Sequence, residues 1–133
     1  MTEFRKVTDS FSVSPQISLD DIAAAAAQGY TLVINNRPDG ESPDQPTSAE
    51  MEAAARAAGL DYIHAPVMGR PGQAAVEAVR DALADGSGKV LAYCRSGTRS
   101  IYTWALGQAG AVDADTLMRQ GAAAGYDLSP VVG

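Results

Sequence analysis

The residues best suited to chemistry lie in one short segment, which reads Cys94-Arg95-Ser96-Gly97-Thr98-Arg99-Ser100. Its cysteine is the only one in the chain and follows an apolar run from Val90 to Tyr93. A short apolar run bounded by turn residues is typical of a buried strand. The pattern from Ile101 to Leu106 is typical of a helix. We therefore expect Cys94 at the junction between a strand and a helix.

A cysteine at such a junction is placed to act as a nucleophile. The first backbone N–H groups of a helix have no partner within the helix and attract anions, so they favour thiolate over thiol. Arg95 and Arg99 add positive charge and planar forks of donors for an anionic substrate. Gly97 lets the loop curl so that its N–H groups converge. We predict Cys94 and Arg99 as catalytic residues, and as substrate-binding residues the rest of the loop: Arg95, Ser96, Gly97, Thr98 and Ser100.

The loop resembles the active-site loops of two groups of enzymes. In single-domain rhodaneses the cysteine takes up a sulfane sulfur as a persulfide. The other group comprises the cysteine-dependent tyrosine and dual-specificity phosphatases. Those phosphatases place five residues between the cysteine and the arginine, whereas four residues separate Cys94 from Arg99.

A wider resemblance covers most of the chain, from about residue 8 to residue 130. The segments Val33-Ile-Asn-Asn-Arg37-Pro-Asp39-Gly-Glu41 and Ala124-Gly-Tyr126-Asp-Leu128 are similar to a bacterial family of phosphatase-like, rhodanese-like domains. Domains of that family occur alone or fused to persulfide dioxygenases of the metallo-β-lactamase type. The resemblance implies a phosphatase-like fold of the dual-specificity type and makes a persulfide dioxygenase a candidate partner. It also places the loop from Asn36 to Pro46 beside the cysteine, so Arg37, Asp39 and Glu41 are secondary site candidates, Arg37 and Asp39 for substrate binding.

Strand-like and helix-like segments alternate along the chain. This alternation predicts an α/β three-layer sandwich, with a mostly parallel central sheet of 4–5 strands and helices on both faces. Residues 1–133 are expected to form a single domain, and residues 1–10 a loose N-terminal arm. We expect a short edge strand at Phe11–Val13, further strands at Thr31–Asn35 and Tyr62–Val67, and helices starting near Ser18, Thr47, Gln73 and Asp113.

Composition excludes several classes of function. The net charge of −6 offers no basic surface for nucleic acid or anionic membranes. Because no apolar run reaches the length of a membrane span or a signal peptide, we expect a cytoplasmic protein with no membrane partner. A single cysteine excludes an internal resolving thiol, so an external thiol must accept any sulfur that Cys94 takes up. His64, the only histidine, is expected to be a hydrogen-bonded strand residue, and we predict no metal and no other cofactor.

Sulfur transfer is the first of three roles that fit the loop. In it, the Cys94 thiolate takes the outer sulfur of thiosulfate or a related sulfane donor and passes it to an external thiol. The alternative is hydrolysis of phosphate monoesters, with Arg99 and the loop amides stabilising the phosphoryl oxygens. In a third role the domain binds anions or senses redox state, and Cys94 only oxidises.

Protonation of the leaving group separates the first two roles. Phosphatases of this kind use an aspartate to protonate the departing oxygen. In the dual-specificity enzymes that aspartate lies on a loop whose counterpart here is Met68–Gly72, which contains no carboxylate. This difference favours sulfur transfer and leaves open whether Asp39 or Asp44 acts as the acid.

Overall fold

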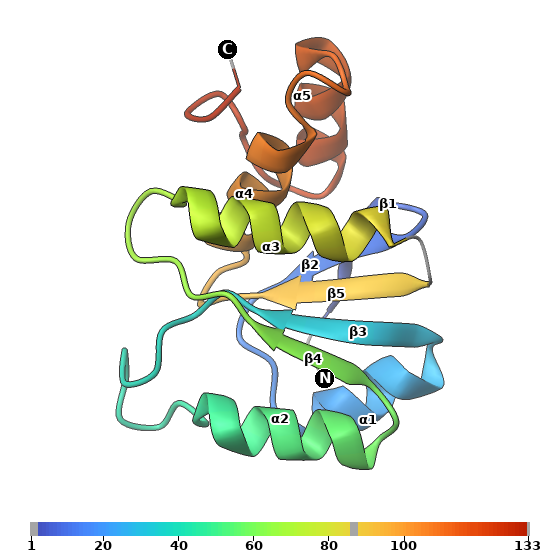
Figure 1. The fold of residues 1–133 in the computed structure, drawn as a ribbon, viewed down its shortest axis with the longest axis vertical. Coiled ribbons are helices and arrows are strands. Elements are labelled where there is room, and N and C mark those ends of the chain that lie inside the picture. The colour runs from blue at the N-terminus through green and yellow to red at the C-terminus, as the bar shows by residue number, and fades with distance from the viewer. Residues whose placement is uncertain (1–2, 86–87, 133) are drawn as a thin grey trace.

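The protein is built around one five-stranded sheet with the strand order β1-β2-β5-β3-β4 (Figure 1). A computed structural model describes residues 3–85 and 88–132. The sheet is parallel except for β1, which runs antiparallel to β2. The strands are β1 (Arg5–Thr8), β2 (Phe11–Ser14), β3 (Tyr30–Asn35), β4 (Asp61–His64) and β5 (Lys89–Tyr93).

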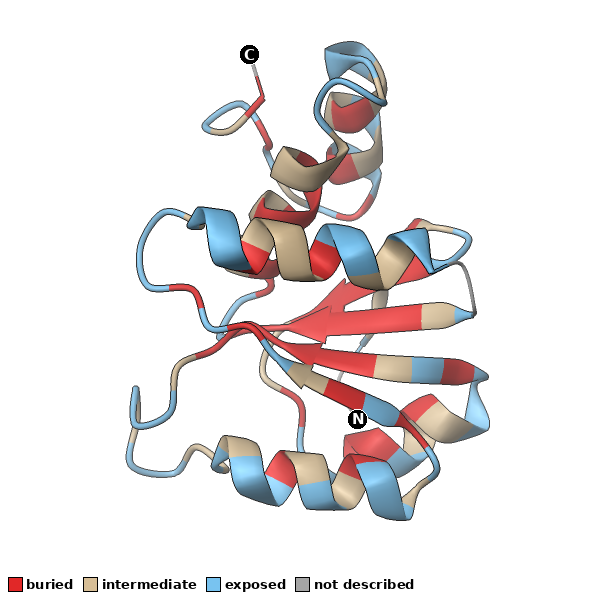
Figure 2. Ribbon diagram, in the orientation of Figure 1, coloured by how far each residue is buried: buried red, intermediate tan, exposed pale blue. Residues whose placement is uncertain are grey.

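Helices cover both faces of this sheet and complete the expected three layers. One face carries α1 (Leu19–Ala27) and α2 (Ser48–Ala57), and the other carries α3 (Gln73–Ala84), α4 (Thr98–Gln108) and α5 (Ala114–Ala123). Successive side chains of the central strand β5 point to opposite faces. Leu91 therefore joins the hydrophobic cluster under α1 and α2, and Ala92 joins the cluster under α3, α4 and α5. Figure 2 shows the resulting band of burial through the middle of the sheet.

The two helices that follow β2 and β3 begin with reciprocal caps. The Ser18 hydroxyl accepts from the Asp21 N–H, and the Asp21 carboxylate accepts from the Ser18 N–H. Thr47 and Glu50 form the same arrangement at the start of α2. Such caps satisfy amides that the helix leaves unpaired, so the sequence locates both helix starts correctly. In the described ranges, no helix combines the length and apolarity needed to cross a bilayer.

The N-terminal segment differs from the expected loose arm. Arg5–Thr8 forms β1 and pairs with β2, which makes β2 an interior strand where the sequence predicts an edge. Val7 is buried against the core. The prediction is wrong here because a four-residue strand with one buried apolar side chain has no clear alternation of its own. Its backbone pairing depends on a neighbour that the local sequence does not reveal.

Candidate active site

Cys94 lies at the centre of the edge where the four parallel strands end. It directly follows β5 and is fully buried, and its N–H donates to Ser14 O over 3.4 Å. The Gly97 N–H donates to Cys94 Sγ over 3.1 Å. Gly97 precedes α4 and has a φ of +89°, a left-handed conformation that suits glycine. The cysteine thus meets the start of a helix, as the sequence predicts.

The guanidinium of Arg99 is fixed by hydrogen bonds on two of its nitrogens. Nη1 donates to Glu41 Oε2 and to Val67 O, and Nη2 donates to Glu41 Oε1, each over 2.8 Å. The hydrogen bonds to Glu41 raise the pKa of Arg99, and the charge of Cys94 acts in the same direction. A guanidinium has five N–H donors. Glu41 and Val67 do not use the edge formed by Nε–H and the second Nη2–H, and Arg99 also interacts with Cys94. Two parallel donors of this kind match two oxygens of an oxyanion.

Glu41 is in turn held by a second arginine. Arg37 Nε donates to Glu41 Oε1 over 2.9 Å, and Arg37 Nη1 donates to Gln16 Oε1 over 2.9 Å. The two hydrogen bonds from Arg99, together with the one from Arg37, lower the pKa of Glu41 to about 2. Arg37 is buried. It and Arg99 both donate to Glu41, so Arg37 helps to hold the carboxylate that orients Arg99. His64 Nε2 lies 3.0 Å from Arg37 O, which confirms the expected hydrogen-bonded strand histidine.

The remaining loop residues surround Cys94 in different ways. The side chains of Arg95 and Ser96 are exposed. Ser96 Oγ donates to Thr98 Oγ1 over 3.0 Å and accepts from Thr98 N–H over 3.3 Å, so the turn is bonded to itself. Ser100 is fully buried, and its hydroxyl has no hydrogen-bond partner in the described structure.

Tyr126 contacts the loop from the C-terminal segment. Its hydroxyl donates to Ser96 O over 2.9 Å, and a Cβ added at Gly97 would collide with that hydroxyl. Sequence reasoning treats Tyr126 only as part of a family segment and assigns it no role. Gly125 predicts the turn after the last helix. The hydrogen bond from Tyr126 to Ser96 joins residues 30 positions apart, so no pattern of neighbouring residues predicts it.

The carboxylates that follow β3 are already engaged. Asp39 Oδ1 accepts from the Ser48 N–H over 2.7 Å at the start of α2. The hydroxyl of Ser42 donates to Asp44 and lowers the pKa of Asp44. Neither side chain forms a described hydrogen bond to the cysteine loop, and both are engaged by groups on their own side of the sheet edge. Asp39, which the sequence predicts to bind substrate, contacts the start of α2 in this structure.

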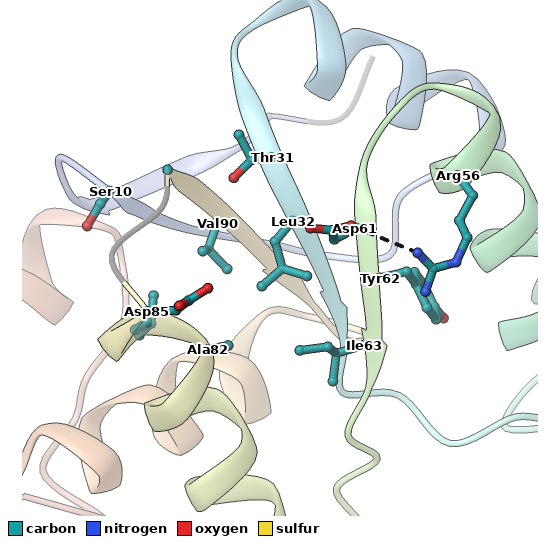
Figure 3. A pocket seen from close by; sticks show the side chains of 12 residues that line it. Ser10, Thr31, Leu32, Arg56, Asp61, Tyr62, Ile63, Ala82, Asp85 and Val90 are labelled. Carbon is teal, nitrogen blue, oxygen red and sulfur yellow. Dashed lines mark ion pairs between the residues drawn. The ribbon is translucent and has the colours of Figure 1, made fainter.

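A separate hollow of about 560 Å³ opens at the opposite edge of the sheet (Figure 3). It lies at the amino ends of β3, β4 and β5, where Arg56 and Asp61 form an ion pair of 3.9 Å. None of the residues around Cys94 lines it. The geometry described above therefore defines the candidate site independently of this hollow.

Comparison with known proteins identifies relatives of the whole chain. The sequence profile of the family described as "Beta-lactamase hydrolase-like protein, phosphatase-like domain" matches residues 3–111. A beta-lactamase hydrolase-like protein of Xylella fastidiosa (strain Temecula1) is 38% identical over 129 residues, which are 95% of this chain. The match covers 30% of that protein, so the chain spans less than a third of this curated relative.

Solved structures agree with this assignment. A Neisseria meningitidis Z2491 protein provisionally described as a phosphatase is 34% identical, with a TM-score of 0.82 over 94% of this chain and 90% of that chain. A complex of P. aeruginosa TpbA with pTyr has a TM-score of 0.65 and 16% identity, over 92% of this chain and 75% of that chain. The second likeness is one of fold. Together they show that the three-layer sandwich is of the phosphatase-like type.

Proposed function

Because the chain belongs to the family of phosphatase-like domains of beta-lactamase hydrolase-like proteins, we propose that it is a cysteine-dependent phosphatase acting on phosphate monoesters. The observation that carries the proposal is that the Gly97 amide donates to Cys94 Sγ while the Arg99 guanidinium, held by Glu41, interacts with the same cysteine. The description of the Neisseria relative and the pTyr bound by TpbA support a small anionic phosphate substrate. The phosphatase hypothesis, second on the sequence alone, thereby comes first.

The proposed reaction has two steps. The Cys94 thiolate attacks phosphorus, so that a P–S bond forms and the P–O bond to the alcohol breaks, and the departing oxygen takes a proton from solvent and leaves as the alcohol. Water then attacks the phosphocysteine, the P–S bond breaks and inorganic phosphate leaves with regeneration of the thiolate. Arg99 and the loop amides hold the phosphoryl oxygens in both steps. Cys94 has no exposed surface here, so contact with a substrate requires the side chains above it to move.

Sulfur transfer is the second candidate, and one observation favours it. The carboxylates after β3 are those of Glu41, Asp39 and Asp44, and they are bonded to Arg99, Ser48 and Ser42 respectively. Hydrolysis of a phosphate monoester is faster when an acid protonates the departing oxygen. Thiosulfate needs none: Cys94 thiolate bonds to the outer sulfur, the S–S bond breaks and sulfite leaves with the electron pair. The Cys94 persulfide then passes its sulfur to an external thiol. A persulfide dioxygenase would be a partner of the protein if sulfur transfer is its function.

Two assays on one preparation test these proposals. We expect wild type to hydrolyse p-nitrophenyl phosphate and Cys94→Ser to lose that activity while keeping its thermal unfolding temperature. Thiosulfate:cyanide sulfur transfer is measured in parallel, with the Cys94 persulfide followed by mass spectrometry. Efficient sulfur transfer without aryl phosphate hydrolysis would reverse the order of the two candidates. Loss of neither activity in Cys94→Ser would remove Cys94 from the mechanism.

A further inference from the structure

Two segments from opposite ends of the chain meet beside the cysteine loop. Tyr126 follows α5, and Arg5 lies in β1, where it pairs with Val13 of β2. The Arg5 guanidinium lies 5.1 Å from the centroid of the Tyr126 ring, a distance at which a cation is attracted to an aromatic face. Tyr126 lies beyond residues 3–111, the part matched by the family profile.

The Tyr126 hydroxyl is bonded to the same peptide unit that contacts the cysteine. Ser96 O, which accepts from Tyr126 over 2.9 Å, and Gly97 N–H, which donates to Cys94 Sγ over 3.1 Å, are the two ends of one planar peptide group. Because none of the described peptide bonds is cis, this C=O and N–H point in opposite directions. Fixing the oxygen therefore fixes the direction of the N–H.

The surroundings keep the phenol in the form that donates. Burial raises the pKa of Tyr126, against a smaller opposite effect of Arg5, so the phenol is protonated at neutral pH. A hydrogen bond to the carbonyl also polarises the peptide and strengthens its N–H as a donor. Gly97 makes the close approach possible, since a Cβ at this position would occupy the place of the hydroxyl.

We propose that Tyr126 is a positioning residue, which orients the Ser96–Gly97 peptide so that its N–H points at Cys94 Sγ and at an oxygen of the bound oxyanion. Arg5 supports this arrangement by holding the ring. The inference rests on the proposed function only in that the loop binds a tetrahedral oxyanion. Its test measures binding of inorganic phosphate and the state of one amide, and it requires no turnover.

The test compares Tyr126→Phe with Tyr102→Phe. Both changes delete one phenolic hydroxyl, but the Tyr102 hydroxyl donates over 3.4 Å to Asp127 O and not to the Ser96–Gly97 peptide. Phosphate is titrated while the amide signals of the loop are followed by NMR, and hydrogen exchange of the Gly97 amide is measured without phosphate. We expect Tyr126→Phe to weaken phosphate binding and to speed exchange at Gly97, each by roughly three- to tenfold. Tyr102→Phe is expected to stay within about twofold of wild type.

Arg5→Gln provides a second variant that retains the hydroxyl and loosens the ring. We expect the same two changes at smaller size, and this variant carries the test if Tyr126→Phe does not fold. Thermal unfolding of each variant separates a local effect from general destabilisation. Gly97 exchange in Tyr126→Phe that matches the Tyr102→Phe control would overturn the proposal. A protein that binds phosphate as expected but hydrolyses no phosphate ester would instead contradict the proposed function and leave the role of Tyr126 supported.

Discussion

The cysteine loop is supported on two sides by unlike chemistry. On one side Arg37 and Glu41 form an ionic chain that ends on the Arg99 guanidinium. On the other, Arg5 and Tyr126 form a contact that ends in a hydroxyl on a backbone carbonyl. The ionic chain fixes the long side chain of Arg99, whose positive charge is balanced by the Glu41 carboxylate. The hydroxyl support fixes a peptide group, which is neutral and needs only one directed hydrogen bond.

This difference predicts different sensitivities. Ion pairs near the surface weaken with salt and with protonation of the acid, and the Glu41 side chain is 29% exposed. A hydrogen bond between a phenol and a carbonyl depends on neither below the pKa of the phenol. Substitutions on the two sides should therefore be separable by their dependence on pH as well as by their size.

The largest effect is expected from replacing the end of the ionic chain. Arg99→Lys retains the positive charge but loses the fork that serves Glu41, Val67 and the oxyanion together. We expect kcat/KM for an aryl phosphate to fall by about 10²–10³-fold. Arg56→Lys, at an exposed ion pair with Glu52, is the matched control and should match wild type. A loss below about threefold in Arg99→Lys would mean that the fork is not needed.

A smaller loss is expected from removing the charge between the two arginines. Glu41→Gln keeps the shape of the side chain but gives Arg99 and Arg37 a weaker, neutral acceptor. We expect kcat/KM to fall by roughly tenfold, the order of one hydrogen bond to a charged group. Glu52→Gln, which removes the same charge from the exposed pair with Arg56, should change kcat/KM by less than twofold. Equal effects in the two variants would contradict a positioning role for Glu41.

The smallest expected effect is a change with pH in the free energy of unfolding, which should differ between Glu41→Gln and Tyr126→Phe. The pKa of Glu41 is lowered from 4.5 to about 2 in the folded chain, so its ion pairs stabilise the fold fully above about pH 4.5. This stabilisation is lost as the pH falls through about 2. Urea unfolding should show the stability difference between wild type and Glu41→Gln shrinking over that window. The difference between wild type and Tyr126→Phe should stay constant there, and a parallel decline would contradict the distinction.

The features that the sequence predicts correctly are those encoded by neighbouring residues. These features are the strand before Cys94, the helix starts at Ser18 and Thr47 and the turn at Gly97, and each depends on residues within a few positions. These local patterns are enough to predict a mostly parallel sheet and to place the cysteine between one of its strands and the following helix. They also locate the start of α3 at Gln73.

The features that it misses depend on contacts between distant segments. Glu41 is predicted to lie near the cysteine, but its two hydrogen bonds to Arg99 cross 58 residues. Tyr126 reaches Ser96 across 30 residues, and β1 acquires its structure only from pairing with β2. Contacts of this kind depend on which distant segments the fold brings together. A short stretch of sequence does not contain that information.

The position of β5 has a consequence for how the protein folds. It is the middle strand of the sheet and the last strand in the chain, with Val90 beside Phe11 on one side and Leu32 on the other. The pair β1-β2 and the pair β3-β4 are joined only through it. Contacts of such large sequence separation slow folding, because loop closure must precede the gain in burial. We therefore expect the surroundings of Cys94 to be assembled in the same late, cooperative event that joins the two halves of the sheet.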